Sequence, residues 1–112
     1  MSKIVEENYS TGHLHEVKIE LNRAIGQYKR YNNDVKIGIT GRPPQERFNE
    51  HLRNDHWERM VVIYRSTSIR YVNEIEAYLC EKHGNSLFNI RGGGGASHMP
   101  IGGYNFVYAL LR

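Results

Sequence analysis

The apolar positions of the chain divide it into alternating helical and extended segments. Between residues 14 and 31, apolar or aromatic side chains recur every three or four residues, which is typical of a helix with one buried face. Val17, Ile19 and Leu21 also alternate, so a strand in this segment stays an alternative. We favour the helix, because its pattern continues for about five turns. Gly26 opposes it by about 1 kcal/mol.

The rest of the chain predicts two further helices and three strands. The turn-forming Asn32-Asn33-Asp34 leads into the first strand, Pro43-Pro44 begins a helix, and Ser66 to Ser68 offer an N-cap for the next. The elements after the first helix are a strand at 35–40 (VKIGIT), a helix from 44 to about 54, a buried strand at 60–64 (MVVIY), a helix that ends at Gly84, a loop containing Gly92 to Gly95, and a strand at 104–111 (YNFVYALL).

This order predicts one α+β domain over residues 1–112. We expect a small mixed or antiparallel sheet of three strands, flanked by helices. Residues 1–31 form an N-terminal helical segment, residues 35–89 form the core, and residues 104–111 close the sheet.

Composition limits the expected cellular location of the protein but does not identify its function. A net charge of +3 permits a polyanionic partner, although such a balance is common in ordinary domains. The single cysteine, Cys80, excludes an intramolecular disulfide, and no apolar run approaches the ~20 residues that span a bilayer. The N-terminal residues lack signal-peptide character. We therefore expect an intracellular protein, cytoplasmic or nuclear, without a membrane partner.

Glu76 is the most unusual residue of the predicted third helix. It falls between Val72 and Leu79, inside the apolar stripe that also contains Ile69 and Ile75. A buried carboxylate without a partner costs several kcal/mol, so Glu76 needs a cation, hydrogen-bond donors or a metal. A structural ion pair with Arg47 is the ordinary interpretation.

Convergence of Lys36, Arg47 and His51 on Glu76 would favour a catalytic role instead. Arg47 and His51 lie four residues apart and therefore on one face of the second helix. A Glu that binds a hard divalent cation, beside Arg and Lys that hold an anion, is what phosphodiester hydrolysis requires.

Other polar residues are weaker candidates. Arg42, His56 and Arg91 are candidates for phosphate contacts, and Asn89 is either a turn former or a supporting site residue. The His13-x-His15 pair lacks further ligands at metal-binding spacing. The glycine run at 92–95 is not followed by Lys-Ser/Thr and so is not a Walker-type phosphate loop.

In combination, these residues resemble the GIY-YIG nuclease superfamily over residues 35 to 89. Domains of that family have a strand ending in Tyr-Ile-Gly, a helix with Arg-x-x-x-His, a central strand, a helix with a metal-binding Glu, and a later Asn. The matching positions here are Lys36-Ile37-Gly38, Arg47 with His51, residues 60–64, Glu76 and Asn89.

The chain departs from the family pattern in two places. Lys36 replaces the first tyrosine of Tyr-Ile-Gly, as in some restriction-enzyme and phage branches, where lysine serves the site. No Gly-Ile-Tyr strand precedes it, and Gly26-Gln27-Tyr28 lies in the predicted helix. Residues 106–111 look more like that strand, which implies a circular permutation with Tyr108 in the tyrosine position. Tyr28 is the alternative.

The resemblance implies a divalent-metal-dependent DNA endonuclease. Glu76 would bind Mg²⁺ or Mn²⁺, Arg47 would stabilise the scissile phosphate, Lys36 and Tyr108 would orient or deprotonate water, and His51 and Asn89 would assist. RNA stays an alternative substrate. The rival interpretations are an inactive nucleic-acid-binding module on the same scaffold and an accessory protein that forms a homodimer through the helix at 14–31.

Overall fold

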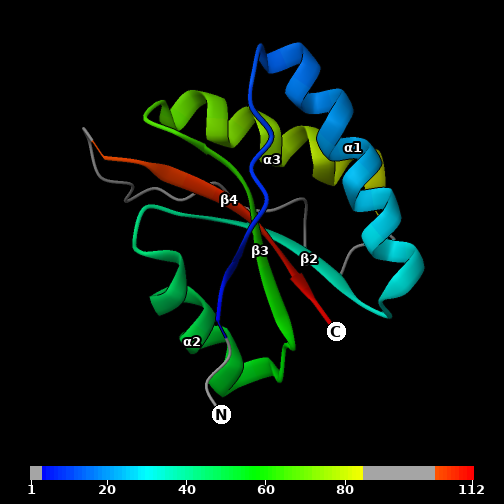
Figure 1. Ribbon diagram of the computed structural model, residues 1–112, viewed down its shortest axis with the longest axis vertical. Helices are drawn as coiled ribbons and strands as arrows, with labels where there is room; N and C mark the ends of the chain where they lie inside the picture. Colours follow the sequence, from blue (N-terminus) through cyan, green and yellow to red (C-terminus); the bar gives the residue numbers. More distant parts are fainter. Residues whose placement is uncertain (1–3, 85–102) are drawn as a thin grey trace.

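The computed structural model describes residues 4–84 and 103–112, apart from the side chains of residues 54 and 55. Seven elements follow one another along the chain (Figure 1). They are β1 (Glu6–Glu7), α1 (Leu14–Tyr31), β2 (Val35–Thr40), α2 (Pro44–Asp55), β3 (Arg59–Ser66), α3 (Ile69–His83) and β4 (Asn105–Leu111).

The predicted helices and strands are confirmed, and local chemistry explains where α3 begins and ends. At its start, the Ser68 hydroxyl accepts a hydrogen bond of 3.2 Å from the backbone N–H of Tyr71. At its end, Gly84 adopts a positive φ of 40° and donates its N–H to the carbonyl of Cys80. Residues 14–31 form a continuous helix, so the strand alternative for that segment is wrong.

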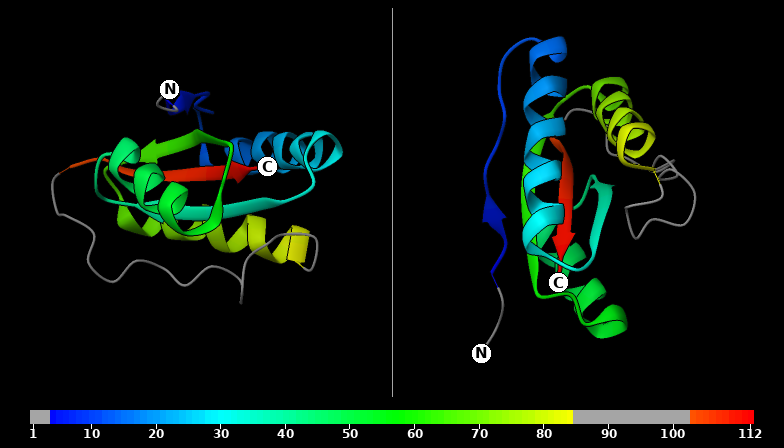
Figure 2. Two further views of the ribbon diagram at one scale, coloured as in Figure 1. Left: turned by 90° about the horizontal axis from the view of Figure 1, so that it is seen from below. Right: turned by 90° about the vertical axis from the view of Figure 1, so that its right-hand side faces the viewer.

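The sheet has four strands in the order β1-β3-β4-β2, which corrects the predicted count of three (Figure 2). The extra strand, β1, pairs in parallel with β3 through Glu6↔Val61 and Glu7↔Val62, whereas the other pairs are antiparallel. Two glutamates carry no alternating pattern, and their extended conformation comes from pairing with β3.

β4 lies between β2 and β3, with Gly38 opposite Tyr108. This confirms the expectation that residues 104–111 run antiparallel to and beside residues 35–40. Tyr28 lies on α1 and not on a strand of the sheet. The C-terminal strand therefore supplies the tyrosine next to Lys36-Ile37-Gly38.

Helices cover both faces of the sheet, with α1 and α3 on one side and α2 on the other (Figures 1 and 2). Alternate residues of β2 face opposite ways, so Val35 and Ile37 pack in the core with α1 and α3, whereas Gly38 faces α2. The core beneath α2 contains Phe48, Trp57, Met60, Val62, Tyr108 and Leu110.

The apolar face of α1 packs on its own chain. Val17 and Ile25 are fully buried and Leu21 is 2% exposed, all within the core shared with α3. These seam residues thus already have partners within the chain, and the structure gives no support to a homodimer through residues 14–31. None of the helices in the described part of the chain combines the length and apolar character needed to cross a lipid bilayer.

Candidate active site at the edge of the sheet

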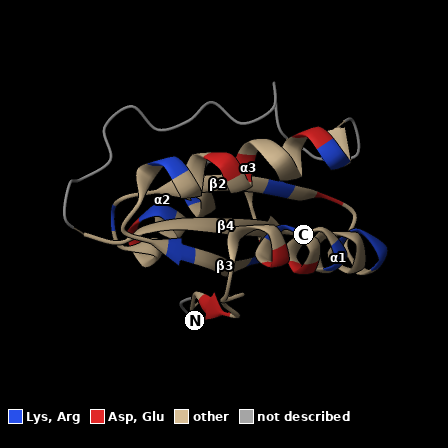
Figure 3. Cartoon of the chain, turned by 90° about the horizontal axis from the view of Figure 1, so that it is seen from above, with Lys and Arg blue, Asp and Glu red and all other residues tan. Residues whose placement is uncertain are grey.

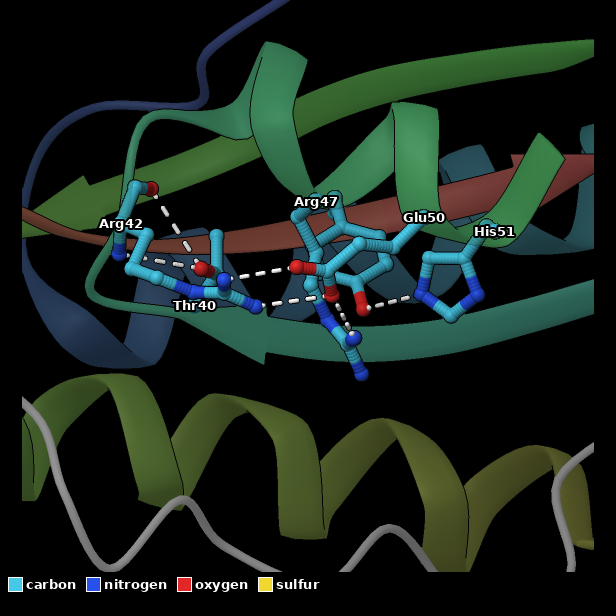
Figure 4. A network of polar contacts seen from close by, with 6 residues as sticks. Thr40, Arg42, Arg47, Glu50 and His51 are labelled. Carbon is cyan, nitrogen blue, oxygen red and sulfur yellow. Dashed lines mark hydrogen bonds and ion pairs between the residues drawn. The ribbon is translucent and has the colours of Figure 1, made fainter. Parts of the chain in front are cut away.

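One face of α2 brings three polar side chains over the sheet. Arg47, Glu50 and His51 project from this helix toward β2, and the fixed spacing of a helix holds them side by side (Figure 4). Pro44 at the first helical position and Phe48 in the core fix the start and the buried side of α2. His51 is only 5% exposed, whereas the side chain of Arg47 is 35% exposed.

The Tyr108 hydroxyl meets His51 at the centre of the site. Its oxygen lies 2.9 Å from His51 Nε2, in a buried contact between β4 and α2. The Tyr108 ring reaches across β2 at Gly38, where a Cβ atom would lie 2.8 Å from Tyr108 Cε1 and would overlap Cζ and the hydroxyl. Glycine at the end of Lys36-Ile37-Gly38 therefore makes room for the tyrosine.

Glu50 joins two arginines in an ion-pair network. Its carboxylate accepts two hydrogen bonds from Arg42, at 2.6 and 2.8 Å, and one of 2.7 Å from Arg47 Nη1. These hydrogen bonds lower the pKa of Glu50 to about 2. Arg47 thus pairs with Glu50, three residues along its own helix, and the predicted ion pair with Glu76 is absent from the described residues.

A turn after β2 positions Arg42. The hydroxyl of Thr40 accepts a hydrogen bond of 3.0 Å from the Arg42 backbone N–H, and Thr40 is itself 4% exposed. This turn directs the exposed Arg42 guanidinium toward α2, and Figure 3 shows basic residues on both β2 and α2. The result is a pair of guanidinium groups that share one carboxylate, an arrangement that an anion with several oxygens can also fill.

Glu76 is buried on α3, as its sequence position predicts, and is 3% exposed. Burial raises the pKa of its carboxyl to about 7. Burial also raises the pKa of the Tyr108 hydroxyl. The nearby Arg47 guanidinium lowers this pKa, whereas the Glu76 carboxylate raises it. Glu76 and Arg47 thus both act electrostatically on the Tyr108 hydroxyl, from different elements.

Glu76 and Asn73 both carry oxygen atoms that a hard cation could use as ligands. Asn73 lies three residues earlier on α3, and its Oδ1 is buried without a hydrogen-bond partner within the described residues. Oxygen donors such as these are what Mg²⁺ prefers. No group of three or more His, Cys, Asp or Glu side chains gathers in that same part of the chain, so a metal here would keep several water or substrate ligands.

The other predicted residues are spread around this centre. Lys36 is half-buried on β2, two residues before Gly38 and so on the same face of the strand. His56 is exposed at the C-cap of α2, with a left-handed φ of 58°. Asn89 and Arg91 lie outside the described residues.

Glu50 is the site residue that sequence reasoning missed. Its position three residues after Arg47 on a helix is a local signal for an ion pair. Its bond to Arg42 depends on the turn after β2 and has no comparable signal.

Searches against protein-family models, curated proteins and solved structures find no match to this chain.

Proposed function

We propose that this protein is a divalent-metal-dependent endonuclease of the GIY-YIG type, circularly permuted, which hydrolyses phosphodiester bonds in DNA. The observation that carries the proposal is the meeting of the Tyr108 hydroxyl, His51 and Arg47 at Gly38, on the strand that the family resemblance singles out. A tyrosine from the C-terminal strand supports the permutation, because it supplies the group that the segment before Lys36 lacks.

Each side chain has a role in this chemistry. Arg47 holds the scissile phosphate and stabilises its developing charge, after the phosphate displaces Glu50 from the guanidinium. Burial raises the pKa of Tyr108, so its hydroxyl keeps its proton at neutral pH and can donate a hydrogen bond to Nε2 of a neutral His51. The Tyr108 oxygen, together with Lys36, then orients the attacking water. As this oxygen accepts a proton from the water, the hydroxyl proton of Tyr108 passes to His51 Nε2.

Glu76 and Asn73 Oδ1 would hold the metal ion. A bound Mg²⁺ or Mn²⁺ supplies Lewis-acid stabilisation of phosphate oxygens and lowers the pKa of water. Ionisation of Glu76, whose pKa of about 7 lies close to neutrality, prepares it as a ligand.

A nucleic-acid-binding module without turnover is the alternative function. The observation in its favour is that Glu50 neutralises both Arg42 and Arg47, the two guanidinium groups that would otherwise attract a scissile phosphate. In that case the arginines serve to position a bound strand, and Tyr108 and His51 only complete the core under α2.

Plasmid cleavage tests the proposal. Supercoiled DNA is incubated with Mg²⁺ or Mn²⁺ and with wild type, Glu76→Ala or Glu74→Ala. Glu74 lies on the same helix but is 39% exposed and pairs with Lys18, so it is the matched control. Nicking or linearisation by wild type and Glu74→Ala, but not by Glu76→Ala, is the expected result.

Binding in EDTA distinguishes the alternatives. A folded wild type that retards DNA on a gel but never cuts it identifies the binding module. A folded wild type that neither binds nor cuts DNA rejects both functions. Circular dichroism of each variant separates loss of chemistry from loss of the fold.

A further inference from the structure

An arginine lies between two tyrosine rings at the end of the sheet beyond the candidate site. The Arg65 guanidinium carbon lies 4.7 Å from the ring centroid of Tyr9 and 4.7 Å from that of Tyr104. The Tyr104 ring in turn lies 6.4 Å from that of Phe106. Arg65 and Tyr104 are exposed, and Tyr104 retains 50% of its accessible surface.

A β-bulge brings Arg65 to this position. The β3–β4 register shifts between Val62 and Tyr64, so that Val62 is opposite Tyr108 and Arg65 is opposite Phe106. Without the extra residue, strict alternation would turn Arg65 toward α1 and α3. With it, Arg65 lies on the face of the sheet that carries the Tyr108 hydroxyl.

The aromatic residues continue the line of the candidate site. Tyr104, Phe106 and Tyr108 follow one another at every second position, and Thr40, which holds the Arg42 turn, is opposite Phe106. At about 3.3 Å per residue, Tyr104 lies about 13 Å from Tyr108 along the strand. One nucleic-acid strand can therefore contact both places.

Packing alone does not account for Tyr104. The position of Tyr9 does not depend on Arg65, because the residues on either side of Tyr9 donate backbone hydrogen bonds of 2.9 Å to the carbonyls of Val62 and Ile63. Tyr104 precedes the first residue of β4 and is half exposed. An exposed aromatic ring beside a guanidinium is the combination on which unpaired nucleobases stack, with the cation attracting the phosphate.

We propose that Tyr104, Phe106 and Arg65 form a stacking site for a base of single-stranded DNA, next to the phosphate held at Arg47. The position of that phosphate rests on the proposed function. Bases inside a duplex are stacked on each other, so this site selects unpaired strands, flaps or ends over an intact double helix.

Fluorescence anisotropy in EDTA tests the site without cleavage. The probe is a fluorescein-labelled oligothymidylate of about 12 nucleotides, compared with a duplex of the same length. The variants are Tyr104→Ala, Tyr104→Phe, which keeps the aromatic face, and Tyr31→Ala, a control at the end of α1 where the tyrosine is 82% exposed. The buried Trp57, the only tryptophan, reports folding.

Tyr104→Ala should weaken single-strand binding by roughly fivefold to a hundredfold. Tyr104→Phe and Tyr31→Ala should bind as wild type does, and duplex affinity should change little. Equal affinity of wild type and a folded Tyr104→Ala, or an equal loss for duplex, overturns the proposal, as does failure of the folded wild type to bind the single strand.

Failure of this site differs from failure of the nuclease. A protein that never cuts plasmid but loses single-strand binding in Tyr104→Ala keeps the stacking site and loses the catalytic proposal. A protein that cuts plasmid, but whose Tyr104→Ala variant binds single strands as wild type does, keeps the catalytic proposal and loses the stacking site.

Discussion

The ring of Tyr108 lies directly against the backbone of Gly38, on the neighbouring strand. A Cβ atom on residue 38 would lie 2.8 Å from Tyr108 Cε1 and would overlap the hydroxyl that contacts His51. Gly38 is thus required by a side chain near the other end of the chain. The pairing of β2 with β4 and the geometry of the site depend on each other.

Gly38→Ala should therefore destabilise the fold. Because Tyr108 is 1% exposed and cannot move aside, the added methyl group should cost about 3 kcal/mol in the free energy of unfolding. Urea denaturation followed by Trp57 fluorescence measures the loss. Gly26→Ala is the control: a Cβ there meets nothing within 4 Å, so removing a helical glycine should stabilise by roughly 0.5–1 kcal/mol. A Gly38→Ala variant as stable as wild type would contradict the packing of Tyr108.

Sequence patterns predicted the longer elements because each has a strong local cause. The three-four spacing of α1 and the proline start of α2 predicted these two helices. Glu76 was expected to be buried because it falls in an apolar helical stripe, and it is. The place of β4 beside β2 followed from the missing tyrosine strand before Lys36.

Features that depend on contacts between residues far apart in the sequence had no such local cause. β1 consists of two glutamates and is a strand only because β3 lies next to it. The bulge near Ile63 falls in a uniformly apolar run. No alternation of polar and apolar residues could therefore mark the point where successive side chains of β3 switch to the other face of the sheet. The carboxylate of Glu50 reaches Arg42 only because a turn folds β2 back toward α2.

Tyr108→Phe should abolish most cleavage while keeping the fold. Under the proposed function, loss of the hydroxyl removes the group that passes the water's proton to His51 Nε2, and rates should fall roughly 10²- to 10⁴-fold. The expected loss of stability is about 1 kcal/mol. Plasmid cleavage in Mg²⁺ measures the rate, and urea denaturation measures the stability.

Tyr64→Phe is the matched control for this substitution. Tyr64 is 8% exposed and packs in the core on the opposite side of the sheet. It should cut as wild type does. Equal activity of Tyr108→Phe and wild type would remove Tyr108 from the catalytic site.

Glu76 should make the metal-free protein less stable as the pH rises. Burial raises the pKa of its carboxyl from 4.5 to about 7, so between these values the folded state binds more protons than the unfolded state. The free energy of unfolding therefore falls from pH 4.5 to 7 and stays low above it, by about 3 kcal/mol in all.

Thermal unfolding in EDTA across this pH range measures the effect. Glu76→Gln should remove the decline and be more stable than wild type at pH 8, whereas the exposed Glu74→Gln should follow wild type. Parallel curves for wild type and Glu76→Gln would show that Glu76 does not titrate as a buried carboxyl.

Under the proposed function, an ionised Glu76 and Asn73 Oδ1 would bind Mg²⁺ in the folded state only, so Mg²⁺ should offset part of this loss. At pH 8, Mg²⁺ at ten times its dissociation constant should stabilise wild type by about 1.4 kcal/mol. Thermal unfolding with and without Mg²⁺ measures it, and Glu76→Gln should show no such gain. An equal gain in both proteins would place the cation elsewhere.

Glu50→Gln should increase affinity for DNA. The Glu50 carboxylate occupies both Arg42 and Arg47, so a phosphate must displace it, and the neutral amide competes less. Because the amide competes less for the two arginines, the dissociation constant should fall roughly fivefold. Anisotropy in EDTA measures it.

The control for Glu50→Gln makes the same change of net charge away from the site. Glu6→Gln breaks the pair of Glu6 with Arg59, at the opposite edge of the sheet from β2. If general electrostatic attraction were the cause, both variants would gain affinity equally. A gain confined to Glu50→Gln shows that the carboxylate acts by holding the two arginines, whereas weaker binding would mean that Glu50 positions them for the phosphate.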